Sequence, residues 1–317
     1  MKIAFYGSSL LSSYWNGAAT YYRGMLSELS KLGWQVTFYE PDAFDRQQHR
    51  DIEPPSWAEV VVYEATPEAC GAVMARAAEA DVVVKASGVG VFDNELLGVM
   101  GFARPDALRI FWDVDAPATL AELRQNPDHP LKAALPTLDH VFTYGGGPPV
   151  IAAYLDIGAR DCRPIYNALD PTTHHPTAPD DRFRVDLALL ANRLPDRERR
   201  IEHYFLEPAA LLPDRTFLLG GSGWEDKAMP ANVRRLGHVG TAEHNAFNVS
   251  PLAVLNVARD SMAEVGFSPA TRVFEAAGAG ACLITDAWEG IEMFLEPDKE
   301  VLVARDGREV AEHLAAL

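Results

Sequence analysis

The sequence contains little cysteine. Three cysteines, Cys70, Cys162 and Cys282, are spread over 317 residues, and none of them forms a Cys-x-x-Cys pair. An odd and scattered set excludes the dense disulfide framework that stabilises small secreted domains. We therefore expect free thiols and a reducing compartment, the cytoplasm.

Basic residues and long apolar runs are also scarce. Lysine and arginine together number 28 against 45 aspartates and glutamates, which gives a formal net charge of −17 at pH 7. A chain this acidic is repelled by the phosphates of bulk nucleic acid and of anionic membranes, so neither is an expected partner. No apolar stretch is long enough to span a membrane, and the apolar start at residues 1–7 is typical of a first strand rather than a signal peptide.

The sequence does contain a regular succession of short apolar runs separated by helical stretches. This alternation is typical of an α/β fold with buried parallel strands. Prolines and turn-forming residues crowd the middle of the chain, at 167–180. We predict a first domain at 1–166, a linker at 167–180 and a second domain at 181–317, which makes two Rossmann-like domains facing a cleft. The strands are expected at 2–6, 34–39, 60–63, 82–85, 108–112, 141–144, 187–191, 216–219, 252–257, 282–285 and 301–303.

The most informative stretch is 266–280, which we predict to be a loop that becomes a helix. Ser268 is a typical N-cap residue, and Pro269 fits the first helical position, where no backbone N–H is needed. Gly278 and Gly280 end the helix before the next strand. The apolar face is expected at Val273, Phe274 and Ala277.

The start of this helix suits a nucleotide. Free N–H groups and the positive end of the helix dipole favour a phosphate, so we expect Ser268, Ala270 and Thr271 to contact one. Arg272 adds a fixed cation, and Glu275 could take both hydroxyls of a ribose. Removing the Glu275 carboxylate is then expected to weaken nucleotide binding without changing the melting temperature of the ligand-free chain. The alternative is an ordinary packed helix with an exposed salt bridge.

The same stretch resembles a known family. Ser-Pro-Ala-Thr-Arg-Val-Phe-Glu at 268–275, followed by the segments 278–286 and 290–292, resembles the donor-binding segment of retaining GT-B glycosyltransferases, and in particular their spore-maturation-protein (CgeB)-like branch. In that superfamily a glutamate at a helix start holds the ribose of a nucleotide sugar, which implies this role for Glu275. The sequence departs from the pattern at Phe267, where many relatives carry another glutamate.

Two other stretches extend the resemblance. Residues 167–170, Asn-Ala-Leu-Asp, resemble the interdomain linker of GT-B enzymes, with Ala168 in place of a glycine. At the other end, 308–317 is expected to begin a helix that stops with the chain. GT-B chains commonly end with a helix that crosses back to the first domain, and we expect this helix to be lacking here.

Further donor contacts are expected where strands of the second domain end, because ligands of open α/β sheets bind there. Asn192 and Arg193 follow the first of these strands, and the planar guanidinium of Arg193 matches phosphate oxygens. Gly221 lies in a glycine-rich segment that a ligand could approach closely, or in a plain turn. His238 and Val239 resemble the segment that lines the base pocket. Three arginines are expected to cover a solvated helix face: Arg197, Arg199 and Arg200.

Candidate catalytic residues lie in the first domain. Asp113 and Asp115 form an Asp-x-Asp pair at a strand end, and Lys85 ends another strand. The resemblance implies that they face the cleft, and we predict a catalytic role, with Asp115 either an acid–base group or simply a helix N-cap. In GT-A transferases such an Asp pair binds a divalent ion, but nothing else here resembles GT-A. The acceptor is expected beside Trp15, Asn16 and Gly17.

Metal ligands are not evident. His174 and His175 are adjacent in the linker, near Asp170, but no third ligand stands at a zinc-like spacing. We interpret the pair as part of a linker turn and predict no metal site.

The resemblance implies a glycosyltransferase that moves a sugar from a nucleotide-sugar donor to an acceptor hydroxyl or a similar nucleophile, with retention of configuration. Arg193, Arg272 and helix N–H groups would stabilise the leaving diphosphate, so neither metal nor cofactor is expected. Two alternatives stay open: a nucleotide-sugar epimerase or phosphorylase on the same fold, and a non-catalytic nucleotide-sugar-binding module.

Overall fold

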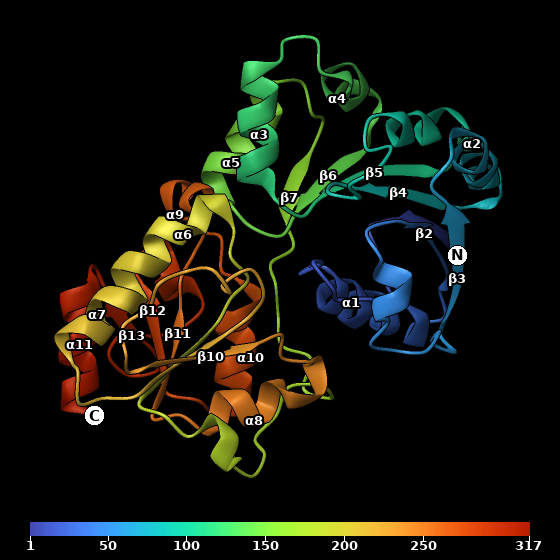
Figure 1. Cartoon of the computed structure of the whole chain (residues 1–317). Coiled ribbons are helices and arrows are strands. Elements are labelled where there is room, and N and C mark those ends of the chain that lie inside the picture. The colour runs from blue at the N-terminus through green and yellow to red at the C-terminus, as the bar shows by residue number, and fades with distance from the viewer. The chain divides into compact units, whose positions relative to one another are not determined.

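The chain forms two compact units. A computed structural model describes residues 1–317, which divide into Met1–Tyr166 and Asn167–Leu317. Each unit is a parallel sheet covered by helices, as Figure 1 shows. The predicted α/β class, with two Rossmann-like domains, is confirmed.

The first unit contains a seven-stranded parallel sheet with the order β3-β2-β1-β4-β5-β6-β7. Its interior strand β1 pairs with β2 through Lys2 and Gln35 and with β4 through Ile3 and Val82. The strands are β1 Lys2–Tyr6, β2 Gln35–Asp42, β3 Ala58–Glu64, β4 Val82–Ala86, β5 Leu108–Asp113, β6 His140–Thr143 and β7 Cys162–Pro164.

Helix α1 of the first unit buries an apolar stripe against this sheet. In α1, Tyr22 and Leu26 pack on Phe5 and Phe38, which alternate with residues facing the other side of their strands. This period of two in the strands and of about 3.6 in the helices is the pattern on which the prediction rested. The helices are α1 Ala19–Lys31, α2 Pro67–Ala75, α3 Ala116–Gln125, α4 Pro130–Ala134 and α5 Gly147–Asp156, with 3₁₀ turns at Arg46–His49, Arg76–Glu79, Glu95–Gly101 and Leu135–Thr137.

The second unit contains a six-stranded parallel sheet with the order β10-β9-β8-β11-β12-β13. It is buried on both faces: Leu187 and Leu189 of β8 face one core, and Ala188 between them faces the other. The strands are β8 Leu187–Leu190, β9 Phe217–Gly220, β10 Val233–Gly237, β11 Ala253–Asn256, β12 Leu283–Asp286 and β13 Leu302–Ala304.

The helices of the second unit lie on the two faces of its sheet. Those that contribute Ile201, Ala209 and Val310 cover one core, and those that contribute Phe247 and Val273 cover the other. None of the helices of the chain is both long and apolar enough to cross a membrane. The helices are α6 Pro195–Ile201, continued by a π-helical turn Glu202–Leu206, α7 Glu207–Leu211, α8 His244–Val249, α9 Asp260–Val265, α10 Thr271–Ala279 and α11 Gly307–Ala316, with 3₁₀ turns at Asp181–Phe183, Thr241–Glu243 and Ile291–Met293.

In each of the two sheets, the chain adds strands outward in one direction and then returns to add strands in the other direction. In the second unit the chain runs outward from β8 through β9 to β10 and then returns to start again at β11, beside β8. Neighbouring helices diverge at such a switch point and leave a crevice outside the carboxyl ends of the two strands. A ligand of the second unit is therefore expected beyond Leu190 and Asn256, the last residues of β8 and β11.

Candidate functional site

Helix α10 begins later than the sequence predicts. Its N-cap is Ala270, and no side chain caps it. Ser268 was predicted to be the cap, but its hydroxyl instead donates to the Gly266 carbonyl at 2.9 Å, so that prediction is wrong. The first N–H groups of α10 consequently have no side-chain acceptor of their own and are available to an anion. Gly280 ends the helix at φ +81°, as predicted.

The loop before α10 is held in a strained conformation. Phe267 has φ +48°, a region that bulky residues rarely adopt, and its N–H donates to the Glu289 carbonyl at 2.6 Å. Its ring lies so close to Gly290 that a Cβ there would come within 2.3 Å of it. Strain of this kind is commonly stored at ligand-binding loops.

Glu275 is buried rather than exposed. Only 8% of its side chain is accessible, because α10 turns Glu275 inward together with Val273 and Ala276, while Ala277, predicted to be packed, is exposed. The nearest cation is Arg272, whose Nη1 lies 3.4 Å from Oε2. The alternative of an ordinary helix with an exposed salt bridge is therefore wrong for this carboxylate.

Two histidines from distant segments complete the surroundings of Glu275. His174 Nε2 lies 3.6 Å from Oε1, and His244 Nδ1 lies 4.0 Å from Oε2. His174 comes from the stretch before β8, and His244 is the first residue of α8. These two nitrogens, His174 Nε2 and His244 Nδ1, are buried and have no hydrogen-bond partner. Local sequence offered no signal for this cluster, because its members are brought together only by the fold.

The charges in the cluster follow from burial and proximity. Burial alone would raise the pKa of Glu275, but the neighbouring Arg272, with smaller contributions from His244 and His174, holds the pKa below its usual value. Glu275 is therefore ionised at neutral pH. Burial lowers the pKa of His244 to about 4 and also lowers the pKa of His174, so both rings are neutral at pH 7.

This arrangement predicts a pH-dependent stability. His244 takes up a proton near pH 4 in the folded chain but at its ordinary 6.5 when unfolded. The unfolded state therefore binds more protons between these values, and stability falls as the pH decreases through this window. The His244 contribution to the free energy of unfolding should fall by about 2 kcal/mol between about pH 7.5 and about pH 5. Urea unfolding of the wild type and of His244→Asn at both pH values measures it as the difference between the two proteins.

The exposed neighbour His238 supplies the control for that experiment. His238→Asn should keep the wild-type stability profile, because the side chain is exposed and lies outside the buried cluster. Equal pH dependence of the wild type and His244→Asn would contradict the burial argument.

The stretch that was predicted to be a linker supports the site. Asn167 is buried and donates from Nδ2 to the Pro269 carbonyl at 3.0 Å, which ties the start of the second unit to the loop before α10. Leu169 lies against α10 where Gly278 offers no side chain, and a Cβ at Gly278 would come within 2.2 Å of it. Residues 167–174 are thus part of the candidate site.

A second group of side chains lies beyond β8 and β11 and is rich in arginine. Arg197 donates from Nη2 to the Asn192 carbonyl at 2.8 Å, and its buried Nε has no partner. Burial, reinforced by the positive charge of Arg259, lowers the pKa of Arg197 to about 10, and Arg272 acts in the same direction. Arg197 was predicted to cover a solvated face, and this is wrong because α6 turns it toward the other arginines. A group of arginines of this kind attracts an anion.

Arg193 is already neutralised. Its Nε and Nη2 form a two-pronged pair with Glu198, both at 2.8 Å, and its Nη1 lies 2.7 Å from Asp226. Two carboxylates around one guanidinium leave little attraction for a diphosphate. The diphosphate role of Arg193 therefore stays a prediction.

The other residues that were predicted to bind the sugar donor differ in their surroundings. Gly221 has φ +114°, and a Cβ there would lie 2.2 Å from the Ala191 carbonyl oxygen, so glycine is required for packing against the end of β8. Asn192 accepts the Ser222 N–H at 2.9 Å through its side chain. Val239 is buried in the core beside Phe247, which leaves only its backbone for a ligand.

In the first unit, the predicted catalytic residues Asp113 and Lys85 are largely enclosed. Asp113 has no exposed surface and accepts hydrogen bonds from Ser87 Oγ at 2.7 Å, Thr119 Oγ1 at 2.9 Å and the Tyr154 hydroxyl. Burial raises its pKa, opposed by these donors. Asp113 thus ties β5 to α3 and α5, a structural role.

Lys85 forms an ion pair with Asp93. Its side chain is 3% exposed and pairs with Asp93 at 2.8 Å, with its ammonium 5.6 Å from the centre of the Phe111 ring. Because this pair satisfies the charge locally, the geometry favours a structural role for Lys85 as well.

Asp115 stands at the N-cap position of α3, yet its carboxylate caps none of the helix N–H groups. The alternative of a simple N-cap is therefore wrong. The backbone at Asp115 is neither helical nor extended, at φ −148° and ψ 61°, and α3 begins directly after it at Ala116.

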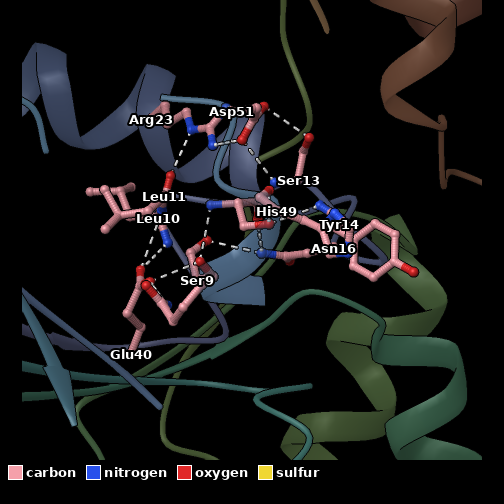
Figure 2. Close-up of polar contacts among 12 residues, drawn as sticks. Ser9, Leu10, Leu11, Ser13, Tyr14, Asn16, Arg23, Glu40, His49 and Asp51 are labelled. Atoms are coloured by element: carbon pink, nitrogen blue, oxygen red, sulfur yellow. Dashed lines mark hydrogen bonds and ion pairs between the residues drawn. The ribbon is translucent and has the colours of Figure 1, made fainter. Parts of the chain in front are cut away.

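The predicted acceptor-side residues belong to a loop with an internal polar network, shown in Figure 2. Asn16 is buried, accepts from Ser8 Oγ at 2.9 Å and donates to the carbonyls of Ser9 and Ser12 at 2.9 and 3.0 Å. Glu40 accepts the Leu10 N–H at 2.5 Å and fixes the same loop from β2. Asn16 thus shapes the loop, whereas Trp15, at φ +48°, and Gly17 are exposed.

A hollow of about 420 Å³ lies elsewhere in the first unit. Its lining includes Lys2, Gln35 and Ala58, the first residues of β1, β2 and β3, together with Trp34 and Trp57. It therefore opens at the amino ends of strands, away from the edge of the sheet where ligands of open α/β folds bind. We do not assign it to the site.

Comparisons with known proteins agree with this architecture. Residues 197–317 match a family described as glycosyl transferase-like. No curated protein sequence matches the chain. Among solved structures, HepE of Anabaena in complex with UDP-glucose superposes with a TM-score of 0.65 at 15% identity, covering 100% of this chain and 89% of HepE.

Two further structures are similar over the same extent. Sucrose-phosphate synthase from Thermosynechococcus elongatus has a TM-score of 0.68 at 15% identity, and BGT of phage T4 in complex with its UDP-glucose substrate has 0.62 at 11%; each alignment covers 100% of this chain and 89% of the other. At these identities the similarity establishes the fold. The chain therefore has the GT-B fold of two Rossmann-like domains, and its residues 197–317 match the glycosyl transferase-like family.

Proposed function

We propose that this protein is a glycosyltransferase that takes its sugar from a nucleotide-sugar donor and transfers it to an acceptor hydroxyl or a similar nucleophile. The observation that carries the proposal is Glu275, an ionised and buried carboxylate in α10, held beside Arg272 and close to an uncapped helix start. The match of residues 197–317 to the glycosyl transferase-like family supports it independently.

The donor is proposed to bind through its ribose and diphosphate. An ionised carboxylate only accepts hydrogen bonds, so Glu275 suits the two ribose hydroxyls as donors. The diphosphate is assigned to Arg272, Arg197 and the first N–H groups of α10, a cationic setting that stabilises the charge on the leaving group. The base is expected beside the backbone of His238 and Val239.

UDP-glucose is the first donor to test, because HepE and BGT were each determined in complex with it. Retention of configuration is proposed from the sequence resemblance alone. In the first unit we propose Asp115 as the acid–base group. The net charge of −17 favours a small acceptor over bulk nucleic acid, which would be repelled.

Calorimetric titration of the purified chain with UDP-, GDP-, ADP- and dTDP-glucose tests the donor class. One of the four should bind, and slow release of free sugar from that donor would identify an enzyme rather than a binding module. Binding without any hydrolysis or transfer would support the non-catalytic alternative, and binding of none would refute the proposal.

Transfer should not depend on a divalent ion. Arg272, Arg197 and the helix N–H groups supply the positive charge that a metal supplies in Asp-x-Asp enzymes. We expect the same rate of sugar transfer or donor hydrolysis with and without a chelator. Loss of activity with chelator and its return with manganese would instead favour a metal-dependent role for Asp113 and Asp115.

A further inference from the structure

Three ligand-type side chains converge in the second unit although the sequence predicts no metal site. The imidazole nitrogens of His174 and His244 and a carboxylate oxygen of Glu275 all lie within 4.8 Å of one another. His174 and Glu275 are buried and His244 is partly buried. Since His175 was the only histidine near His174 in sequence, the cluster could not be recognised from spacing.

The hydrogen bonds around His174 place its proton on Nδ1, so the nitrogen that faces Glu275, Nε2, is an acceptor. The Thr173 hydroxyl donates to the Asp170 carbonyl at 3.2 Å, so its oxygen is left to accept from His174 Nδ1 at 3.0 Å. With its proton on Nδ1, the neutral ring has a lone pair on Nε2. That lone pair points toward Glu275 Oε1 at 3.6 Å and has no partner.

His244 is oriented in the same way. Its ring has a hydrogen bond to the Val239 backbone that raises its pKa, as donation to a carbonyl does, and Nδ1 is the buried atom without a partner. The proton is therefore on Nε2, and Nδ1 presents a lone pair toward Glu275 Oε2 at 4.0 Å. Metal-bound histidines are typically held in this manner, with the outer N–H donated to an oxygen.

The cluster thus brings two imidazole lone pairs and one carboxylate together with no proton between them. The nearest donor is Arg272, 3.4 Å from Glu275 Oε2, and its Nη1 also contacts Asn248 Oδ1 at 3.3 Å. In a tetrahedral zinc site with bonds of about 2.0–2.1 Å, ligand atoms lie about 3.3 Å apart. The two imidazole nitrogens lie 3.6 and 4.0 Å from different oxygens of Glu275, and one ligand atom from each residue lies within 4.8 Å of the others, so the side chains must move closer together to bind an ion.

We propose that His174, His244 and Glu275 bind a divalent transition metal ion of the zinc class. Two nitrogens and one oxygen suit Zn²⁺ and Co²⁺, whereas Mg²⁺ and Ca²⁺ prefer oxygen alone. The positive charge of Arg272 opposes a dication, so the ion is displaceable. It also needs the carboxylate that the proposed function assigns to ribose, which makes the ion a competitor of the nucleotide and not a cofactor.

Metal binding is tested on the metal-free full-length chain. Co²⁺ titration should produce the visible absorption of a tetrahedral site with histidine ligands, and calorimetry with Zn²⁺ should give one ion per chain. His174→Ala and His244→Ala should each weaken Zn²⁺ binding at least tenfold, while His175→Ala, at the exposed neighbour, should not. No stoichiometric binding, or equal affinity in all three variants, would overturn the proposal; the wild-type Co²⁺ spectrum decides the matter if a variant fails to fold.

Competition is tested separately with UDP, which rests on the proposed function. Saturating Zn²⁺ should weaken UDP binding at least tenfold, and chelator should restore it. Zn²⁺ and UDP binding together without mutual effect would overturn the competition. If UDP binds neither with nor without Zn²⁺, the proposed donor site fails, whereas the metal site is judged on the Zn²⁺ and Co²⁺ titrations alone.

Discussion

Replacing Glu275 by glutamine should raise the dissociation constant for the donor nucleotide about 10- to 150-fold. Two ribose hydroxyls that donate to an ionised carboxylate contribute about 1.5–3 kcal/mol to binding. The neutral amide of glutamine has the same shape but lacks the charge that strengthens these hydrogen bonds, and its NH₂ group would face a hydroxyl that also donates. Calorimetry with UDP-glucose, or with whichever nucleotide sugar the screen identifies, measures the change.

The same substitution should also lower the melting temperature of the ligand-free chain. From the sequence alone we expected no such effect, but Glu275 is the buried partner of Arg272, and a partly buried cation left without its counter-charge is destabilising. Glu264→Gln, at an exposed position of α9, is the matched control and should alter neither property. A lower melting temperature with unchanged affinity would show that Glu275 only neutralises Arg272.

The fold could be predicted because most of its strands are apolar on both faces. Runs such as Val82–Ala86 need no knowledge of their neighbours to be recognised as buried parallel strands. The two strands that were missed are edge strands. β10 carries Arg234 and Arg235, both exposed, and β7 has three residues with Arg163 exposed in the middle, so backbone pairing with β9 and β6 defines them and no apolar pattern does.

The candidate site was predictable only where it is local. Arg272 and Glu275 are three residues apart on one helix, so their proximity follows from helical geometry alone. His174 and Asn167 reach the same place from about a hundred residues away, and no spacing rule connects them to α10.

The direction in which α6 points its side chains explains why Arg197, and not Arg193, lies near the other arginines. Arg193 and Arg197 follow the same strand, and sequence position favoured the first as the phosphate ligand. In the structure Glu198 and Asp226 neutralise Arg193, while α6 turns Arg197 toward Arg259 and Arg272. Which of two nearby arginines is left without a carboxylate depends on partners as far away as residue 226, and the local sequence does not contain that information.

Within the Asp-x-Asp pair, we propose Asp115 rather than Asp113 as the acid–base group. Asp113, its partner in the Asp-x-Asp pair, is fully buried and its oxygens accept from three side chains. Asp115 is only partly buried, follows the carboxyl end of β5 and does not cap α3. Of the two aspartates, Asp115 is therefore the more exposed one.

Changing Asp115 to asparagine should slow sugar transfer about a hundredfold or more, the lower range for loss of an acid–base group. Affinity for the donor should stay within about twofold, or roughly 0.4 kcal/mol, because the proposed donor contacts all lie in the second unit. Steady-state transfer rates and donor titration of the same preparations separate the two quantities. Asp42→Asn, at the exposed end of β2 in the same sheet, is the matched control and should transfer at the wild-type rate. Normal transfer by Asp115→Asn together with a lower melting temperature would show that Asp115 is structural, since an acid–base group affects the rate and not the fold.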